Sequence, residues 1–175
     1  MSSPASRRLK LIELYASVQG ESTHVGRPCT FVRLAGCHLR CTWCDSTYTF
    51  KGGDWWTQDE ILDRVLELGP KLVQITGGEP LLQKNSIPLM QALLDRGCEV
   101  LLETSGASDI SKVPDGVCII MDLKPPDSGE ESRNIWDNIH HLDDADEIKF
   151  VIASRGDYEW SRNVVRGRGL EGRFT

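Results

Sequence analysis

The stretch CTFVRLAGCHLRCTWCDS, residues 29–46, joins a strand-like run to a loop that carries three closely spaced cysteines. Residues 29–36 are rich in β-branched and apolar side chains and end at Gly36, which predicts a buried strand with the loop at its carboxyl end. The loop cysteines are Cys37, Cys41 and Cys44, in the spacing C-x3-C-x2-C. This strand and its loop set the expectation for the rest of the fold.

The cysteine spacing indicates an iron–sulfur cluster, because cysteine thiolates hold such clusters and three ligands on four irons leave one iron open. A structural zinc site is the alternative, since a C-x2-C pair is a common zinc motif. The zinc interpretation lacks a fourth ligand at zinc-finger spacing. His38 is adjacent to Cys37 and could not easily complete a tetrahedron with it, and His24, His140 and His141 lie outside the loop.

Length and composition limit the class of protein. The 175 residues are 39% hydrophobic and 26% charged, which predicts one globular domain with a proper core. The formal net charge of −6 argues against non-specific nucleic-acid binding, and no apolar run reaches the length of a membrane helix. Residues 1–10 have no apolar segment of a secretory signal. The other cysteines, Cys29, Cys98 and Cys118, are expected to be reduced, buried thiols, which favours a cytoplasmic protein without membrane or nucleic-acid partners.

Strand-like and helix-like segments alternate along the chain. Strands are predicted within 11–22 and at 29–36, 71–76, 98–104, 117–124 and 146–154, and helices at 57–68, 85–97, 132–142 and from 157 onward. Thr57 and Glu60 form a capping-box pattern, and Gly97 closes the second helix. The alternation predicts an α/β fold with a parallel sheet, but too few units for an eight-unit barrel of about 250 residues. We therefore expect an incomplete, open TIM-like barrel.

The polar motifs fall at the carboxyl ends of four predicted strands. They are the cysteine loop, Gly77-Gly78-Glu79-Pro80, Thr104-Ser105-Gly106 and Asp122-Leu123-Lys124. Chemistry in open α/β sheets and barrels is concentrated at this edge of the sheet. The sequence therefore predicts one active site, built from several strand ends.

At these residues the chain resembles the 7-carboxy-7-deazaguanine synthase family of radical S-adenosylmethionine enzymes. The cysteine motif by itself indicates only the superfamily, whereas the QGE turn together with CDS and TGGEP narrows the resemblance to this synthase. The likeness covers about residues 11–160. Its motifs are ELYASVQGES (13–22), GRPCTFVRLAGCHLRCTWCDSTYTF (26–50), LVQITGGEPLLQ (72–83), LLETSG (101–106) and MDLKPP (121–126).

The resemblance implies a carbon–nitrogen lyase of queuosine and deazapurine biosynthesis. Such an enzyme converts 6-carboxy-5,6,7,8-tetrahydropterin into 7-carboxy-7-deazaguanine with loss of ammonia. It implies a [4Fe–4S] cluster, S-adenosylmethionine and Mg²⁺ as cofactors. It also implies an electron donor such as flavodoxin or ferredoxin, and a homodimer.

The resemblance assigns roles to individual residues. The cluster ligands would be Cys37, Cys41 and Cys44, and Ser46 would bind Mg²⁺ where the family usually has threonine. Arg33 would pair with the substrate carboxylate, which suits a planar bidentate group. The predicted S-adenosylmethionine contacts are Trp43, Cys44, Asp45, Gly78, Ser105, Asp122, Leu123 and Lys124. The predicted substrate contacts are Val18, Gln19, Gly20, Arg33 and Thr76.

Two further hypotheses stay open: another radical enzyme, such as an activase of glycyl-radical enzymes, or an inactive cluster- or zinc-binding protein. The second follows from the end of the chain. Family members usually continue for some tens of residues past Val165, whereas this chain runs into VVRGRGLEGRFT (164–175), which has no apolar period. We predict one domain over residues 1–165 and a frayed or truncated tail over 166–175, which would remove part of the substrate site.

Overall fold

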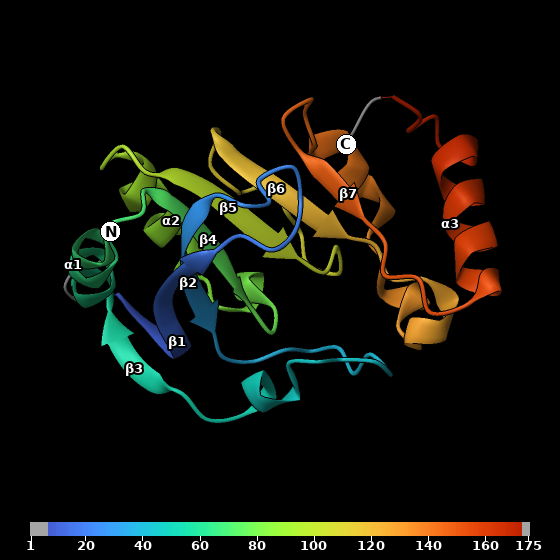
Figure 1. Ribbon diagram of the computed structural model, residues 1–175. Coiled ribbons are helices and arrows are strands. Elements are labelled where there is room, and N and C mark those ends of the chain that lie inside the picture. Colours follow the sequence, from blue (N-terminus) through green and yellow to red (C-terminus); the bar gives the residue numbers. More distant parts are fainter. Residues whose placement is uncertain (1–6, 173–175) are drawn as a thin grey trace.

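The computed structural model describes residues 7–172 and shows a single mixed sheet with helices packed against it (Figure 1). The seven strands lie in the order β3-β1-β2-β4-β5-β6-β7. Because β3 and β7 are the two ends of this order, the sheet is open, as predicted. The strands are β1 (Arg8–Val18), β2 (Pro28–Leu34), β3 (Asp54–Thr57), β4 (Leu72–Gly77), β5 (Glu99–Thr104), β6 (Val117–Asp122) and β7 (Glu147–Lys149).

The strands from β2 through β4, β5 and β6 to β7 are parallel, whereas β1 is antiparallel to both β2 and β3. The prediction of an α/β open barrel with parallel βα units is confirmed, and β1 and β3 add an antiparallel edge to it. Strand β3 was not predicted, because it contains only Asp54–Thr57 and so short a run shows no clear alternation.

Three α-helices are present in the described residues: α1 (Gln58–Leu68), α2 (Ser86–Leu94) and α3 (Arg155–Gly167). The predicted capping box of α1 is confirmed. The Glu60 amide donates to the Thr57 hydroxyl at 3.2 Å, and the Thr57 amide donates to the Glu60 carboxylate at 2.7 Å. Gly97 follows α2 with a φ of +71°, as expected for a residue that ends a helix.

Alternation along the parallel strands separates the two faces of the sheet. One face packs against α1 and α2 through a large cluster that includes Val73, Ile75, Val100 and Leu102. The other face has a smaller apolar cluster that includes Leu101. Toward the carboxyl ends of the strands, this second face carries polar side chains in place of apolar ones, namely Arg33, Gln74, Thr76, Glu103 and Lys149.

Two predicted elements differ in the structure. Residues 132–142 form short 3-10 turns, Glu131–Arg133 and Trp136–His141, instead of an α-helix. The Asn138 amide donates to the carbonyls of Gly106 and Ser108, which fastens this segment to the chain after β5. The strand predicted at 146–154 is β7, which ends at Lys149; Phe150 then leaves the sheet edge and packs edge-on against Trp160.

The first part of the segment predicted as a frayed or truncated tail, 166–175, is folded against the rest of the chain. Helix α3 continues to Gly167, and Leu170 is 4% exposed in a cluster with Ile139 and Leu142. The last residues of the predicted tail, 173–175, lie outside the described residues. No helix within residues 7–172 has the length and apolar character that crossing a membrane requires.

Candidate active site

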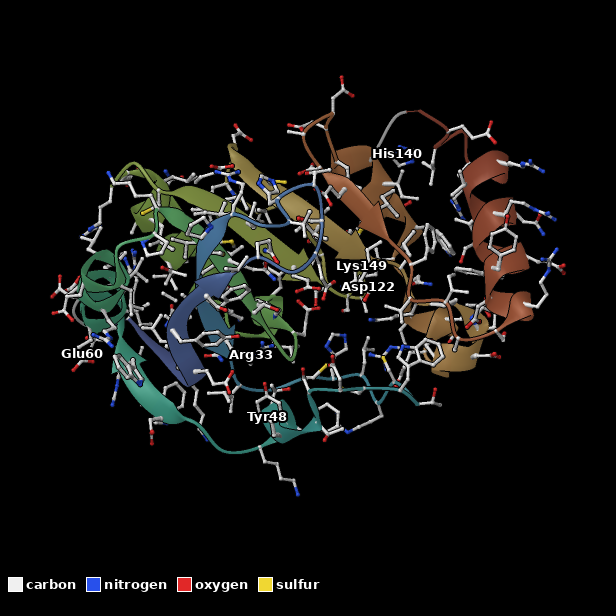
Figure 2. The ribbon with its side chains drawn as sticks, in the orientation of Figure 1. Arg33, Tyr48, Glu60, Asp122, His140 and Lys149 are labelled. Carbon is white, nitrogen blue, oxygen red and sulfur yellow. The ribbon has the colours of Figure 1, made fainter. Side chains whose placement is uncertain are left out.

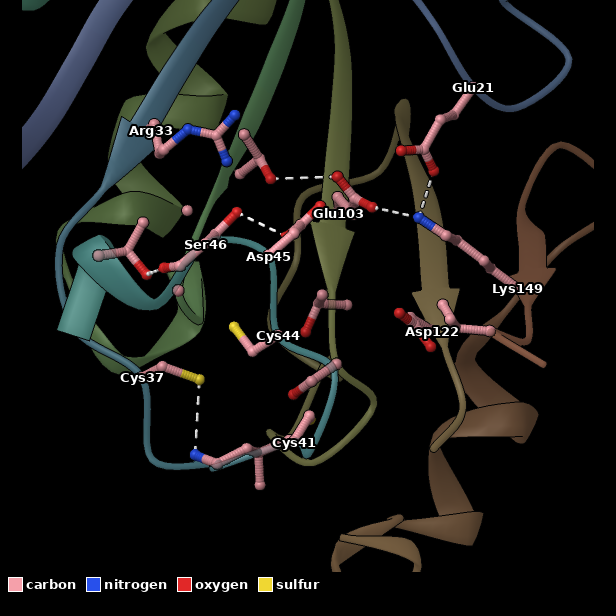
Figure 3. A pocket seen from close by; sticks show the side chains of 18 of the residues that line it. Glu21, Arg33, Cys37, Cys41, Cys44, Asp45, Ser46, Glu103, Asp122 and Lys149 are labelled. Carbon is pink, nitrogen blue, oxygen red and sulfur yellow. Dashed lines mark hydrogen bonds and ion pairs between the residues drawn. The ribbon is translucent and has the colours of Figure 1, made fainter. Parts of the chain in front are cut away.

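A pocket of about 490 Å³ lies at the carboxyl ends of the parallel strands, where the cysteine loop folds back across them (Figures 2 and 3). It contains residues from the loop after β2 and from the ends of β4, β5, β6 and β7. The prediction that the motifs at the strand ends lie close together is therefore confirmed.

Cys37, Cys41 and Cys44 all line this pocket as half-buried, unpaired thiols. Burial raises the pKa of Cys37 and Cys41, and the nearby ammonium of Lys124 opposes the rise. The Cys37 sulfur also accepts a hydrogen bond from the Leu39 amide at 3.4 Å. Amide donors of this kind are one of the means by which proteins tune iron–sulfur clusters.

The spacing of the three sulfurs favours a cluster over a single zinc ion. Two thiolates on one tetrahedral zinc lie about 3.8 Å apart, given a Zn–S bond of about 2.3 Å. Among the described residues, the group whose ligand atoms all lie within 4.8 Å of one another is formed elsewhere, by His24, Cys118 and Glu147. The loop cysteines are more widely set, which fits a larger inorganic group better than one ion.

Gly77 and Gly78 have a packing role beside the cysteine loop. A Cβ on Gly77 would lie 2.2 Å from the Leu34 carbonyl oxygen, and one on Gly78 would lie 2.2 Å from the Gly36 carbonyl oxygen and 2.8 Å from the Cys37 Cβ. A Cβ atom in a real protein essentially never lies this close to a non-bonded heavy atom. The glycines therefore let the end of β4 press against the chain that carries the cysteines.

Glu79 is fully buried and ties two strand ends together. Its carboxylate accepts from the Leu81 amide at 3.0 Å, from the Thr104 hydroxyl at 2.9 Å, and from the amide and hydroxyl of Ser105 at 2.9 and 2.5 Å. Sequence reasoning assigned Glu79 no role. The Ser105 hydroxyl, predicted to contact S-adenosylmethionine, is directed at this carboxylate.

Asp122 and Lys124 form a buried ion pair of 2.8 Å on the pocket wall. Burial raises the pKa of Asp122, and Lys124 offsets part of that rise. The Asp122 Oδ1 atom is buried without a hydrogen-bond partner. Because a buried acceptor without a partner is costly, this atom is suited to accept from a hydroxyl or ammonium group of a bound ligand.

A network of charged side chains lies away from the three cysteines and beside Asp122, whose Cα partner on β7 is Lys149 (Figure 3). The Lys149 ammonium donates to the carboxylate of Glu103 at 2.8 Å and also to that of Glu21. The other Glu103 oxygen accepts from Gln74 at 2.8 Å and from Thr76 at 3.1 Å. Burial lowers the pKa of Lys149, but the two glutamates outweigh it, so the net shift is upward and the ammonium stays charged.

Arg33 lines the pocket from β2, across the view from Lys149 in Figure 3, and is held by Glu13, whose carboxylate accepts from the Arg33 Nε at 3.0 Å. This pair fixes the plane of the guanidinium at the pocket wall. At the cysteine loop, the Ser46 hydroxyl donates to Asp45 Oδ1 at 2.8 Å. The two side chains place hard oxygen atoms together, which is the donor type that Mg²⁺ takes.

The pocket brings together most, but not all, of the predicted site residues. Val18 is 60% exposed and does not line it, and Leu123 is fully buried in an apolar cluster and does not line it either. Glu79, Glu103 and Lys149 were not predicted as site residues. Glu103 and Lys149 lie on predicted strands, where the alternation of side chains could have placed them on the polar face of the sheet. The predicted residues that line the pocket are Gln19, Gly20, Arg33, Cys37, Cys41, Trp43, Cys44, Asp45, Ser46, Thr76, Gly78, Ser105, Asp122 and Lys124.

Residues 31–124 match the family model described as the radical SAM superfamily. A 7-carboxy-7-deazaguanine synthase of Koribacter versatilis (strain Ellin345) is 50% identical over 169 residues, covering 95% of this chain and 75% of the relative. The chain belongs to the 7-carboxy-7-deazaguanine synthase family. A synthase of Chlorobaculum tepidum is 43% identical over 170 residues, covering 95% and 77%.

The fold agrees with that assignment. The crystal structure of QueE from Escherichia coli superposes with a TM-score of 0.76, at 22% identity, over 93% of this chain and 80% of that one. The cofactors of this radical SAM family are a [4Fe–4S] cluster, S-adenosylmethionine and Mg²⁺. The widely set thiols, the Asp122 acceptor without a partner and the paired Asp45 and Ser46 oxygens fit these three groups.

Proposed function

We propose that the chain is a carbon–nitrogen lyase that converts 6-carboxy-5,6,7,8-tetrahydropterin into 7-carboxy-7-deazaguanine, with loss of ammonia. The observation that carries the proposal is the 50% identity with a 7-carboxy-7-deazaguanine synthase over 95% of this chain. The pocket supports it, because it is lined both by cofactor-type residues and by residues suited to a carboxylated, hydrogen-bonding ring.

Cofactor binding falls to the loop side of the pocket. Cys37, Cys41 and Cys44 would hold the cluster, and Ser46 would ligate Mg²⁺. S-Adenosylmethionine would be held by Trp43, Asp45, Gly78 and the Asp122–Lys124 strand end, with Asp122 Oδ1 as a hydrogen-bond acceptor. When bound, these groups supply the one-electron chemistry that starts the reaction. The role of the chain is to orient them and to exclude water.

Substrate binding falls to Arg33 and the network around Lys149. The Arg33 guanidinium, oriented by Glu13, pairs with the substrate carboxylate. Glu103 and Glu21 are acceptors for the ring N–H groups of a pterin, which present several donors side by side. Lys149 is a positioning residue, because its ammonium contacts both carboxylates and holds them in place.

The partners follow from the same assignment. A reductant such as flavodoxin or ferredoxin supplies electrons, and no nucleic acid takes part. We expect a homodimer and a cytoplasmic location, the latter because all six cysteines are unpaired thiols. The edge strand β3, with Trp55 57% exposed, is a candidate dimer surface that sedimentation of wild type and Trp55→Ala can test.

The decisive assay reconstitutes the full chain anaerobically with iron and sulfide and supplies reductant, S-adenosylmethionine, Mg²⁺ and 6-carboxytetrahydropterin. Mass spectrometry should detect 7-carboxy-7-deazaguanine, and Cys41→Ala should abolish it while Cys29→Ala retains it. Release of 5′-deoxyadenosine without this product would refute the substrate and favour another radical SAM reaction. An iron-free chain that takes up only zinc would refute the enzyme itself.

A further inference from the structure

A second cluster of metal-ligand side chains lies at the other end of the sheet, near the amino ends of β6 and β7. It comprises His24 from the loop between β1 and β2, Cys118 from β6 and Glu147 from β7. One ligand atom of each lies within 4.8 Å of the other two, and the His24 Nε2 is 4.0 Å from the Cys118 sulfur. Neither the family assignment nor the proposed reaction uses these three residues.

The local backbone fixes His24 in this position. The loop is closed at its base, where the Gln19 amide donates to the Arg27 carbonyl and the Gly26 amide to the Gln19 carbonyl, each at 2.8 Å. Ser22 adopts a φ of +65°, which a residue with a side chain rarely does. Its hydroxyl accepts from the His24 amide at 3.1 Å. In Figure 1 this loop, in blue, reaches across to β6.

Glu147 is buried and joins the loop to β7. One of its oxygens accepts from the amide of Thr23 at 3.1 Å and from the Thr23 hydroxyl at 2.5 Å. These two bonds hold the carboxylate directly beside His24. The Cys118 thiol is half-buried and donates to the Ala145 carbonyl at 3.1 Å, so its sulfur faces the same small space.

A carboxylate also stands behind the imidazole. Glu99 Oε1 is 3.5 Å from the His24 Nδ1, the ring nitrogen opposite to the one that faces Cys118. Metal-bound histidines typically donate their other N–H to such a carboxylate. Arg27 contacts the same Nδ1 at 2.6 Å, so metal binding requires this exposed guanidinium to release the ring, while it keeps its two bonds to Glu99.

We propose that His24, Cys118 and Glu147 bind a zinc-class divalent cation that fastens the β1–β2 loop to β6 and β7. Thiolate and imidazole ligands favour Zn²⁺ over Mg²⁺ or Ca²⁺. Ligand atoms on a tetrahedral zinc are about 3.3–3.8 Å apart, so modest side-chain rotations from the present separations close the site. Water fills the fourth position. Gln19, Gly20 and Glu21 precede His24 on the same loop, so the ion also steadies one wall of the active-site pocket.

The test is a calorimetric titration of Zn²⁺ into the full chain with its iron–sulfur cluster already loaded, with iron content measured before and after. We expect one equivalent of zinc with no loss of iron, and a rise in Tm. Cys118→Ser and His24→Gln should each weaken binding about 100-fold or more, and Glu99→Gln about tenfold. Cys98→Ser, a buried thiol elsewhere in the chain, is the matched control and should bind as wild type.

Cobalt gives a readout that depends on the sulfur. Co²⁺ added to the loaded chain should produce a thiolate-to-metal absorption band, absent in Cys118→Ser and present in Cys98→Ser. Three results would overturn the site: no zinc beyond the cluster, zinc that displaces iron, or an unchanged isotherm in His24→Gln. Because His24 lies in a partly exposed loop, the last variant decides the question even where Cys118→Ser fails to fold. The outcome is independent of the proposed function.

Discussion

The two ends of the parallel sheet carry cysteine-containing sites of different geometry. At the carboxyl ends, three thiols line a large pocket and do not all lie within 4.8 Å of one another. At the amino ends, one thiol, one imidazole and one carboxylate gather within 4.8 Å. The same residue type thus serves two chemistries, and the spacing of the ligand atoms separates a cluster that takes part in a reaction from a single ion that joins segments.

The largest effect is expected from a substitution that disrupts only the site at the carboxyl ends of the strands. Cys41→Ala should remove nearly all bound iron and all product, because a site with two remaining thiolates cannot hold the cluster. Cys29→Ala removes a buried thiol outside the pocket and should keep both iron and product. Iron and sulfide analysis with the product assay measures this. Full iron in the Cys41 variant would show that the ligands are assigned wrongly.

The next effect separates substrate binding from cofactor chemistry within the same pocket. Lys149→Met leaves Glu103 and Glu21 without their shared cation, and should lower kcat/KM for the carboxypterin about 30-fold, which corresponds to about 2 kcal/mol. Lys149→Arg keeps the charge and should recover part of the loss. Substrate-free cleavage of S-adenosylmethionine should be unchanged in both. A loss confined to that cleavage would place Lys149 on the cofactor side.

A smaller effect tests the packing beneath the cysteine loop. Gly78→Ala forces a Cβ against the Gly36 carbonyl, and should destabilise the fold by about 3 kcal/mol, or about 6–12 °C in Tm. Gly167→Ala, where nothing lies within 4 Å of the added Cβ, is the control and should not lower Tm. Equal Tm values for the two variants would mean that Gly78 does not support the loop by close packing.

The smallest expected effect is a loss of stability from a substitution that leaves the sites at both ends of the sheet intact. Thr57→Ala removes the cap of α1 and should cost about 1 kcal/mol, or about 2–4 °C, with unchanged metal content. Hydrogen bonds from Thr57 lower the pKa of Glu60 below its ordinary value of 4.5. The stability from this depressed pKa is present above 4.5 and is lost as the pH falls through the lowered pKa. The backbone amide of residue 57, the larger cause, remains in Thr57→Ala, so thermal denaturation should show the difference between the two proteins only narrowing in acid.

The parts of the fold that could be predicted depend mostly on residues close together in the sequence. The α1 capping box, the Gly97 helix stop and the β4 and β5 strands follow from residues that act within a few positions. The segment at 132–142 could not be predicted correctly, because its helical spacing is overridden by the tertiary bonds of Asn138. Strand β3 is likewise defined by its pairing with β1 rather than by its own four residues.

The candidate site shows the same division. The cysteine loop and the GGEP turn could be recognised as motifs, and the parallel strands then brought them together. Lys149 could not be linked to Glu21 and Glu103 from sequence, because 128 and 46 positions separate them. The His24 cluster was hidden for the same reason, since its ligands come from three elements, and no short spacing unites them.

Simultaneous metal analysis tests the central contrast most directly. The full chain is loaded with iron, sulfide and zinc, desalted anaerobically, and measured as wild type, Cys41→Ala and His24→Gln. We expect about four irons and one zinc in wild type, loss of iron alone in Cys41→Ala, and loss of zinc alone in His24→Gln. Zinc that disappears with Cys41, or iron that disappears with His24, would contradict a division of the two metals between the two ends of the sheet.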